Sequence, residues 1–442
     1  MKEEMKQFTE PARQKIDVHC HLFNKRVTSI SLLFNLIKSI RTKEEDQVTA
    51  GEKFSSFRER LKRIVRLLKL LFSKNDDTLA EYLLKYEPDT ILVPLMFDLH
   101  YAVTSKDALQ MLSEMNTELK EQLETFMADK NTSEVIPDDE LSELDALHEE
   151  INRFIVEHEN VCTDLSVCSS KEDTFDTQYR QILKLKAKYG PTLRPFFAVD
   201  PRRSGVYQQM RDAIEKDGFA GVKMYCPNGY SPLDPRLDNV YRYCLDNNIP
   251  ITEHCSYGGF ATLENKIEVR GFIYKDHQVV EYTGTLSFTK KIIQRGGVEE
   301  RALALNHPDL WNMVLERYKG LKLNLAHMGI RQSNDLKKRF EWSELITQMM
   351  LRHENLYTDF SCMTEEETIV YLWNMACKAD QKYDGQWKIT DRIMFGTDFW
   401  LNMLTKDMDQ YLKSFHAAFS EKSEDLIRIQ TINPCRFLDL TD

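Results

Sequence analysis

Two histidines near the start of the chain, His19 and His21, are separated by one residue at the end of the segment Ile16-Asp17-Val18-His19-Cys20-His21. Side chains in a strand alternate between two faces, so both histidines would point the same way. Neutral imidazole is a common ligand for zinc and similar metals, and a catalytic metal site needs about three protein ligands and an open position for water. The pair alone fits either part of a metal site or a chance pairing in a half-buried strand.

Four further side chains that could take part in chemistry lie late in, or directly at the end of, short apolar runs: Lys223, His254, His327 and Asp398. Each also has a purely structural explanation. A buried histidine can be a hydrogen-bonded core residue, and Asp398, within Gly-Thr-Asp, could cap the following turn. Six such residues at strand ends are hard to explain by chance, which favours one common site.

The elements that would position these residues alternate regularly along the chain. Segments with helical periodicity separate eight apolar runs, which read as strands at 16–21, 91–97, 194–199, 219–225, 249–255, 321–327, 355–360 and 392–398. Eight strands, each followed by a helix, predict an α/β fold of the (β/α)8 TIM-barrel type, whose catalytic residues sit at the carboxyl ends of the strands. The six side chains would then face one another across the barrel mouth.

Three long segments interrupt this pattern. Helical insertions are predicted at about 22–90 and 98–175, after the first and second strands, and a poorly periodic insertion at about 258–297 follows the fifth. A chain of 442 residues can form one large domain or two medium ones. We predict a single, distorted barrel over residues 1–442, with segments 22–90 and 258–297 covering the site, because loops after strands lie on that face.

Composition narrows the class of partner. The formal net charge of -11 argues against general affinity for nucleic acid or anionic membranes, which are polyanions. The N-terminus is charged and lacks the apolar run of a signal peptide, so we expect no secretion. The sequence contains no run of about twenty apolar residues, so we expect no membrane span. The nine cysteines form no CxxC pair, which favours reduced thiols over a disulfide framework or a structural zinc site. We therefore expect a cytoplasmic protein with a small-molecule partner, and a homo-oligomer remains open.

The order of these residues resembles the amidohydrolase superfamily of metal-dependent hydrolases: His-x-His on strand one, Lys on four, His on five, His on six and Asp on eight. Its amidohydrolase-2 branch is similar in five local strings, which are Asp17-Val18-His19-Cys20-His21, Gly221-Val222-Lys223, Leu325-Ala326-His327-Met328-Gly329, Phe395-Gly396-Thr397-Asp398 and Ile432-Asn433-Pro434-Cys435-Arg436-Phe437-Leu438. The resemblance covers all eight strands but none of the insertions.

The resemblance implies that His19, His21, His254 and Asp398 bind a divalent metal. Zinc is expected, with manganese and iron as alternatives, because nitrogen and carboxylate ligands suit several ions. Zinc lowers the pKa of a bound water to about 7, which would supply a nucleophile at neutral pH. Asp398 could accept the proton of that water, and His327 could hydrogen-bond the water or polarise the substrate.

Lys223 has two possible roles. In binuclear members of the superfamily a lysine at this position is carboxylated and bridges two metals. We favour one metal, with Lys223 unmodified as a cation for an anionic substrate group or as a polar residue of the barrel lining. Tyr225, Arg202, Arg203 and Arg331 also follow strand ends and could contact an acid, although each could equally be a surface or packing residue.

These inferences predict a hydrolase that cleaves a C–N or C–O bond of a small polar, anionic molecule with metal-activated water. The main alternative is a decarboxylase or hydratase of the same branch, since the ligand set does not separate these reactions. A catalytically inactive binding barrel is the third alternative. It is disfavoured because the full ligand set is present.

Overall fold

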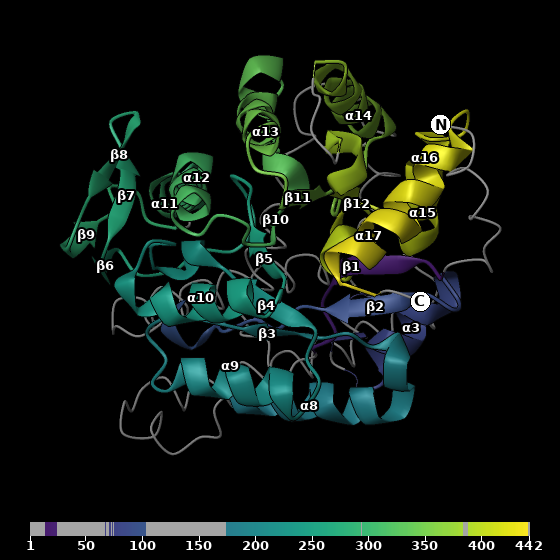
Figure 1. The fold of residues 1–442 in the computed structure, drawn as a ribbon, viewed down its shortest axis with the longest axis horizontal. Coiled ribbons are helices and arrows are strands. Elements are labelled where there is room, and N and C mark those ends of the chain that lie inside the picture. Colours follow the sequence, from purple (N-terminus) through teal and green to yellow (C-terminus); the bar gives the residue numbers. More distant parts are fainter. Residues whose placement is uncertain are drawn as a thin grey trace, which may run out of the picture.

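The computed structural model of the chain describes residues 14–23, 67, 70–71, 73, 75–102, 174–292, 294–382 and 388–440 (Figure 1). Six strands form one parallel sheet in the order β12-β11-β10-β5-β4-β3, and β1 pairs in parallel with β2. Their bounds are β1 Ile16–Cys20, β2 Ile91–Pro94, β3 Phe196–Ala198, β4 Gly221–Met224, β5 Ile251–His254, β10 Leu323–Ala326, β11 Leu356–Asp359 and β12 Ile393–Met394.

Backbone contacts at both ends of the six-stranded sheet close it into a ring with β1 and β2. On one side Leu95 bridges to Phe196 of β3. On the other, the Val18 amide donates to the Phe395 carbonyl oxygen at 3.1 Å, just after β12. The eight strands therefore form a parallel barrel, which confirms the predicted fold class. Irregular register between β1 and β2, and a β12 of only two residues, make the barrel distorted.

Helices surround the strands, as Figure 1 shows. Parallel strands are covered on both faces, and every residue of the barrel strands except Ile91 is buried. In α9 the buried side chains Val206, Met210 and Ala213 recur at helical spacing and face the barrel. The helices are α3 Thr78–Tyr86, α8 Thr174–Tyr189, α9 Val206–Glu215, α10 Asp238–Asp246, α11 Gly297–Asn306, α12 Pro308–Arg317, α13 Leu336–Met350, α14 Glu366–Asp380, α15 Met408–Ala417, α16 Ser423–Ile427 and α17 Asn433–Phe437.

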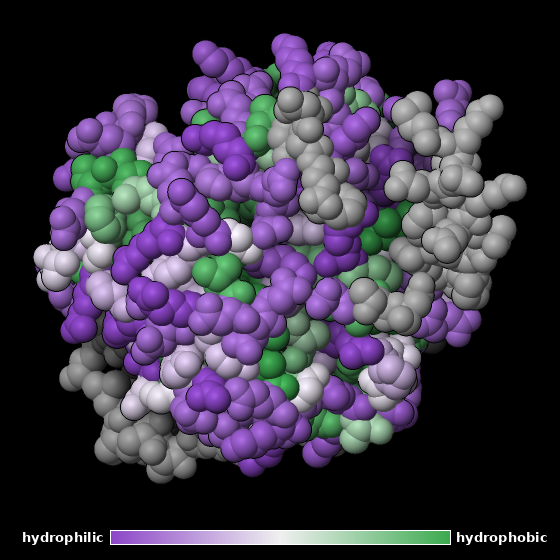
Figure 2. Space-filling model, in the orientation of Figure 1, coloured by the Kyte–Doolittle hydropathy of each residue, from purple (hydrophilic) through white to green (hydrophobic). Residues whose placement is uncertain are grey.

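The segment after β5 contains two antiparallel pairs of strands that the sequence analysis did not anticipate. β6 (Lys266–Val269) pairs with β9 (Gly284–Ser287), and β7 (Phe272–Lys275) pairs with β8 (Gln278–Glu281). The turn between β7 and β8 places Asp276 and His277 at positive φ, the geometry of a two-residue hairpin loop. In Figure 2 polar side chains cover most of the visible face, and apolar ones gather near the β7–β8 hairpin.

The predicted helical insertions fall largely outside the described residues. Of segment 22–90 the structure describes α3 and the buried side chains Leu67, Leu70 and Leu71, and of segment 98–175 it describes little more than a helical turn at His100–Ala102. The single-domain organisation therefore stays a prediction. Within the described ranges, no helix has both the length and the apolar character needed to cross a membrane.

Candidate functional site

The six residues singled out at strand ends all lie at the carboxyl side of the barrel, and none is more than 7% exposed. The structure brings three of them into one group. Nε2 of His19 and Nε2 of His21 lie 3.4 and 3.2 Å from the same carboxylate oxygen, Oδ1 of Asp398. One ligand atom from each of the three residues lies within 4.8 Å of the other two. This spacing suits a shared metal ion.

Asp398 Oδ1 is buried, and no hydrogen-bond donor reaches it from the described residues. A buried carboxylate oxygen without a donor is costly unless a cation or an ordered water satisfies it. His21 presents its Nε2 to this oxygen because its Nδ1 lies 3.0 Å from the Leu95 carbonyl oxygen, which can only accept. The donor set of two imidazoles and a carboxylate therefore fits a divalent metal.

Asp17 holds this group together from behind. Its carboxylate accepts hydrogen bonds from the His19 amide at 3.1 Å, the Thr397 amide at 3.0 Å and the Thr397 hydroxyl at 2.6 Å. The Asp398 amide donates to the His19 carbonyl oxygen at 2.7 Å. The end of β1 is thus tied to the segment after β12, which sets the distance between the histidines and Asp398.

The charge states also suit metal binding. Burial lowers the pKa of His19 to about 4, so the ring is neutral at pH 7 and keeps a lone pair. Burial alone would raise the pKa of Asp398. The neighbouring imidazole rings, His19 first and then His21, outweigh it and hold that pKa below the usual range of a carboxyl group. A neutral imidazole and an ionised carboxylate are the forms that bind a cation.

His254 and His327 form a second pair beside this group. Nδ1 of His254 lies 3.0 Å from Nε2 of His327. Nε2 of His254 lies 2.9 Å from the Gly258 carbonyl oxygen and 3.0 Å from the Ser256 hydroxyl. The structure does not bring His254 into the group of His19, His21 and Asp398, so its role as a metal ligand stays a prediction.

Two residues of the site, Asp359 and Ser361, were missed by the sequence analysis. Asp359 ends β11, and its ligand oxygen groups with nitrogens of His19 and His327 within 4.8 Å. Ser361 Oγ lies 3.1 Å from Nδ1 of His19 and 2.9 Å from Nδ1 of His327. The sequence does contain a signal for Asp359, which ends the predicted strand in Leu-Tyr-Thr-Asp-Phe-Ser. The candidate residues at five other strand ends were identified by this same position.

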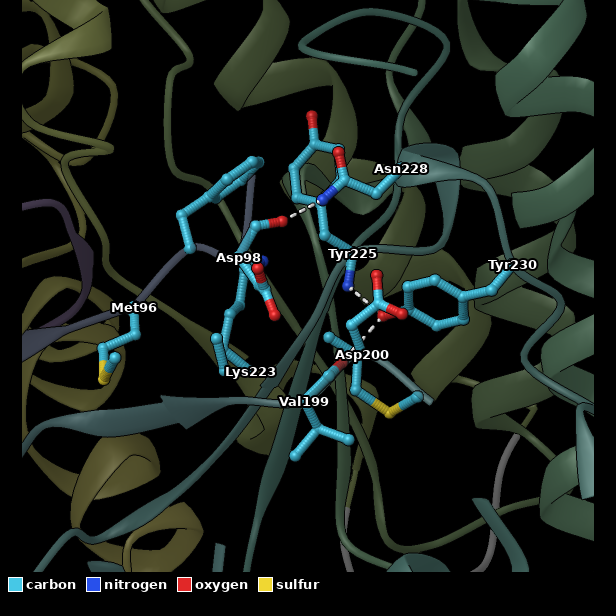
Figure 3. Close-up of a pocket in the computed structure, with 11 residues that line it drawn as sticks. Met96, Asp98, Val199, Asp200, Lys223, Tyr225, Asn228 and Tyr230 are labelled. Atoms are coloured by element: carbon cyan, nitrogen blue, oxygen red, sulfur yellow. Dashed lines mark hydrogen bonds between the residues drawn. The ribbon is translucent and has the colours of Figure 1, made fainter. Parts of the chain in front are cut away.

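A cavity of about 200 Å³, including space open to solvent, lies beside Lys223 (Figure 3). Lys223 Nζ is buried, has no hydrogen-bond partner among the described residues, and lies 5.5 Å from the centre of the Tyr225 ring. Burial lowers the pKa of Lys223. The walls of the cavity are Met96, Phe97, Asp98, Ala198, Val199, Asp200, Lys223, Met224, Tyr225, Asn228 and Tyr230.

Hydrogen bonds hold the residues of the cavity wall in place. The Tyr225 amide donates to the Tyr230 hydroxyl at 2.8 Å, and that hydroxyl donates to the Val199 carbonyl oxygen at 3.0 Å (Figure 3). The Tyr225 hydroxyl accepts from the Phe260 amide at 2.7 Å, so the start of the segment after β5 packs on the cavity wall. The Tyr225 ring stacks on His254 with centres 4.5 Å apart, which connects the cavity to the histidines.

The arginines proposed to contact an acid are engaged within the chain. Arg202 donates to both oxygens of Asp200, at 2.9 and 2.6 Å. Arg203 pairs in the same way with Asp98, at 2.6 and 3.0 Å. Arg331 forms an ion pair with Glu299, and its guanidinium lies 4.8 Å from the centre of the Tyr257 ring. Among the described residues that line the cavity, Lys223 is therefore the cation without a carboxylate hydrogen-bonded to it.

Comparison with known proteins identifies one family and several solved structures of low sequence identity. A family model described as amidohydrolase matches residues 16–440. Three solved structures illustrate the similarity. The 5-carboxyvanillate decarboxylase of Novosphingobium aromaticivorans, complexed with manganese and 4-hydroxy-3-methoxy-5-nitrobenzoic acid, is 10% identical, with a TM-score of 0.46 over 97% of this chain and 96% of that one.

The 2,6-dihydroxybenzoate decarboxylase from Rhizobium is 14% identical, with a TM-score of 0.43 over 97% of this chain and 99% of that one. The 4-oxalomesaconate hydratase from Rhodopseudomonas palustris is 11% identical, with a TM-score of 0.45 over 96% of each chain. None of the curated proteins compared with the sequence matches it.

Proposed function

The chain belongs to the amidohydrolase family, and on that premise we propose that it is a metal-dependent hydrolase that cleaves a C–N or C–O bond of a small anionic molecule. The observation that carries the proposal is the buried Oδ1 atom of Asp398, which has no hydrogen-bond donor among the described residues and faces Nε2 of both His19 and His21. Two imidazole nitrogens and a carboxylate oxygen within 4.8 Å of one another are the kind of ligand atoms that bind a divalent cation.

His19, His21 and Asp398 would hold the metal, and the family resemblance adds His254 as a fourth ligand. Zinc is our expectation, with manganese and iron as alternatives, because imidazole and carboxylate ligands do not select strongly among these ions. When bound, the ion would supply an activated water molecule as the nucleophile. We favour one ion over two, with Lys223 unmodified.

His327 is the proposed acid–base residue. Its Nδ1 lies 3.2 Å from the carbonyl oxygen of Ser361, which can only accept, so Nδ1 carries the proton and Nε2 the lone pair. That lone pair can take a proton from the reacting water and return it to the leaving group. Asp398 could also accept a proton from the water, because its carboxylate is ionised and lies beside the proposed metal position.

Lys223 and Tyr225 would bind the substrate. A buried ammonium group without a hydrogen-bond partner suits a carboxylate or other anionic substituent, since such a pair replaces the water that both groups lose. The proposal that Arg202 and Arg331 also bind substrate is weakened by their pairing with Asp200 and Glu299. A cytoplasmic location stays a prediction.

The test combines metal analysis with a reaction panel on the same sample. The purified protein should carry close to one equivalent of a divalent metal. It should hydrolyse a member of a panel of small amides, esters and lactones bearing a carboxylate. His19→Ala should lose both metal and activity, whereas His416→Ala, a histidine on α15 outside both ligand groups, should keep them.

Three results would count against the proposal. A protein that binds none of zinc, manganese or iron would remove the metal site itself. Release of CO₂ or hydration of a double bond, without hydrolysis, would identify a lyase. A protein that binds metal and anionic ligands but turns over none of the panel would indicate an inactive binding barrel.

A further inference from the structure

Asp359, at the end of β11, is contacted by polar groups of β1 and β10 and of the segments that directly follow β10 and β11. Its Oδ1 accepts from the His327 amide at 3.0 Å, from the Ser361 amide at 3.1 Å and from the Ser361 hydroxyl. Its Oδ2 accepts from Nδ2 of Asn324 at 2.8 Å and lies 3.3 Å from Nδ1 of His19. Asp359 is fully buried, so water does not compete for these contacts.

Asp359 and Asp398 differ in how many hydrogen-bond donors surround their carboxylates. A carboxylate offers about four lone-pair positions on its two oxygens, and five donors converge on Asp359. Asp398 Oδ1, by contrast, has no donor among the described residues. Both carboxylates group with His19 within reach of a metal. Only Asp398 has lone pairs left for an ion, so Asp359 acts on the histidines and not on the metal.

The surroundings of His19 then decide which of its nitrogens carries the proton. Nδ1 faces Oδ2 of Asp359 at 3.3 Å and Oγ of Ser361 at 3.1 Å. The Ser361 hydroxyl donates its hydrogen to Asp359, so its lone pairs point at the ring. Every partner of Nδ1 is therefore an acceptor. The proton lies on Nδ1, and the lone pair of Nε2 is directed at Asp398.

Ser361 also influences which ring nitrogen of His327 carries the proton. Its oxygen Oγ also lies 2.9 Å from Nδ1 of His327, and its carbonyl oxygen lies 3.2 Å from the same nitrogen. Both are acceptors once the hydroxyl hydrogen is given to Asp359. One buried carboxylate thus directs the lone pairs of the proposed ligand His19 and of the proposed acid–base residue His327.

We propose that Asp359 is a positioning residue that holds His19 in the tautomer protonated at Nδ1, and that through Ser361 it holds His327 in the same tautomer. The inference rests on the proposed metal site, because the tautomer matters most if Nε2 of His19 binds an ion. Groups that hydrogen-bond a metal-binding histidine from behind commonly change metal affinity by about 10- to 100-fold when removed.

The substitution Asp359→Asn has a specific consequence. The two backbone amides of His327 and Ser361 are fixed donors, so the asparagine must turn its oxygen toward them. Its NH₂ group then replaces Oδ2. Asn324 can turn its own amide, whose Oδ1 has no hydrogen-bond partner among the described residues, to accept one hydrogen. His19 must accept the other at Nδ1, which moves its proton to Nε2 and removes the lone pair that faces Asp398.

The experiment reads the tautomer directly. The full chain is labelled with ¹⁵N-histidine and stripped of metal with a chelator. Long-range ¹H–¹⁵N spectra are then recorded, with His19 assigned by its loss in His19→Gln. The parent should show His19 protonated at Nδ1, and Asp359→Asn should show it protonated at Nε2. Zinc affinity, measured by competition with a chromophoric chelator, should fall by about 10- to 100-fold in Asp359→Asn.

Two control variants separate positioning from a general effect on the fold. Asp234→Asn removes another buried carboxylate, which pairs with Arg236 away from the histidines, and should keep both the tautomer and the zinc affinity of the parent. Ser361→Ala leaves Oδ2 of Asp359 facing His19 and should keep the His19 tautomer. In His327 the preference for a proton at Nδ1 should weaken but persist, because the side-chain acceptor is removed while the backbone carbonyl oxygen of residue 361 remains.

The outcomes are distinguishable. A parent with His19 protonated at Nε2 overturns the inference, even if Asp359→Asn does not fold. An Asp359→Asn variant with the parent tautomer and the parent zinc affinity also overturns it. A parent that shows the expected tautomer but binds no zinc supports the inference about Asp359 and overturns the proposed metal site instead.

Discussion

Nδ1 of His254 and Nε2 of His327 lie 3.0 Å apart, although 73 residues separate them in the chain. The outer nitrogen of each ring faces a carbonyl oxygen, that of Gly258 at 2.9 Å and that of Ser361 at 3.2 Å. When both outer nitrogens donate to these oxygens, the two inner nitrogens present lone pairs to each other. Such a pair needs a cation between or beside them, either a shared proton or a metal ion.

His254→Ala should therefore weaken metal retention. Burial lowers the pKa of His254 well below its usual value, so at pH 7 its ring is neutral and can bind a metal. Metal remaining after dialysis against a chelator should fall below that of the parent, in the same direction as for His19→Ala. Full retention would show that His254 is a hydrogen-bond partner of His327 and not a ligand.

His327→Asn should separate chemistry from metal binding. The asparagine cannot act as an acid–base group near pH 7, and the expected loss of rate is roughly 10²- to 10⁴-fold. The metal content should stay at the parent level, because His327 is not one of the proposed ligands. Metal loss as complete as in His19→Ala would make His327 a ligand, and would favour a binuclear site with a carboxylated, bridging Lys223.

Asp398→Asn should lower both metal content and turnover. Asparagine preserves the shape of the side chain but replaces an ionised oxygen with a neutral one, which binds a divalent cation more weakly. Metal analysis and rate measurement on the same sample test this. Asp234→Asn serves as the matched control, and an Asp398→Asn variant with parental metal content would remove Asp398 from the ligand set.

Lys223→Met should impair substrate binding without harming the fold. The substitution removes a buried ammonium group that has no hydrogen-bond partner among the described residues, and keeps a side chain of similar length. KM for an anionic substrate should rise by about 10- to 100-fold, the value of a charge-assisted hydrogen bond. The urea midpoint should stay equal or increase, because an unpaired buried charge is unfavourable.

The matched control is Lys322→Met, which alters a buried lysine that precedes β10, at the opposite end of the barrel. Its KM should equal that of the parent. An unchanged KM in Lys223→Met would rule out an interaction between Lys223 and the anionic group of the substrate.

His307 should make stability depend on pH. Burial lowers the pKa of His307 to about 3 in the folded state, from about 6.5 in the unfolded chain. Between these values only the unfolded chain binds the proton, so the free energy of unfolding decreases as pH falls from about 6.5 toward 3. Asparagine can still cap α12, where the His307 ring accepts from the Asp309 amide.

The measurement is the urea midpoint of the parent and of His307→Asn at several pH values from 7 to 4. The variant should lose less stability than the parent over this interval, whatever its stability at pH 7. Parallel curves for the two proteins would show that His307 is not responsible.

The sequence alone determined the eight strands and most of the residues at their ends. A strand buried on both faces is mostly apolar, so the run at 91–97 stands out and the polar residue after it, Asp98, is easily found. The barrel rule then places such residues at one mouth. Neither step needs knowledge of which strands are neighbours.

Tertiary structure decided which of these polar groups meet. The bond between Asp359 and His19 spans 340 residues and exists only because the barrel closes between the last strand and the first. Closure also leaves Asp398 Oδ1 without a donor while Asp359 is crowded with donors. Packing likewise pairs Arg203 with Asp98, a residue 105 positions away in the chain. Local patterns indicate which residue types lie at the mouth, but hydrogen bonds between distant segments depend on the angle and distance set by packing.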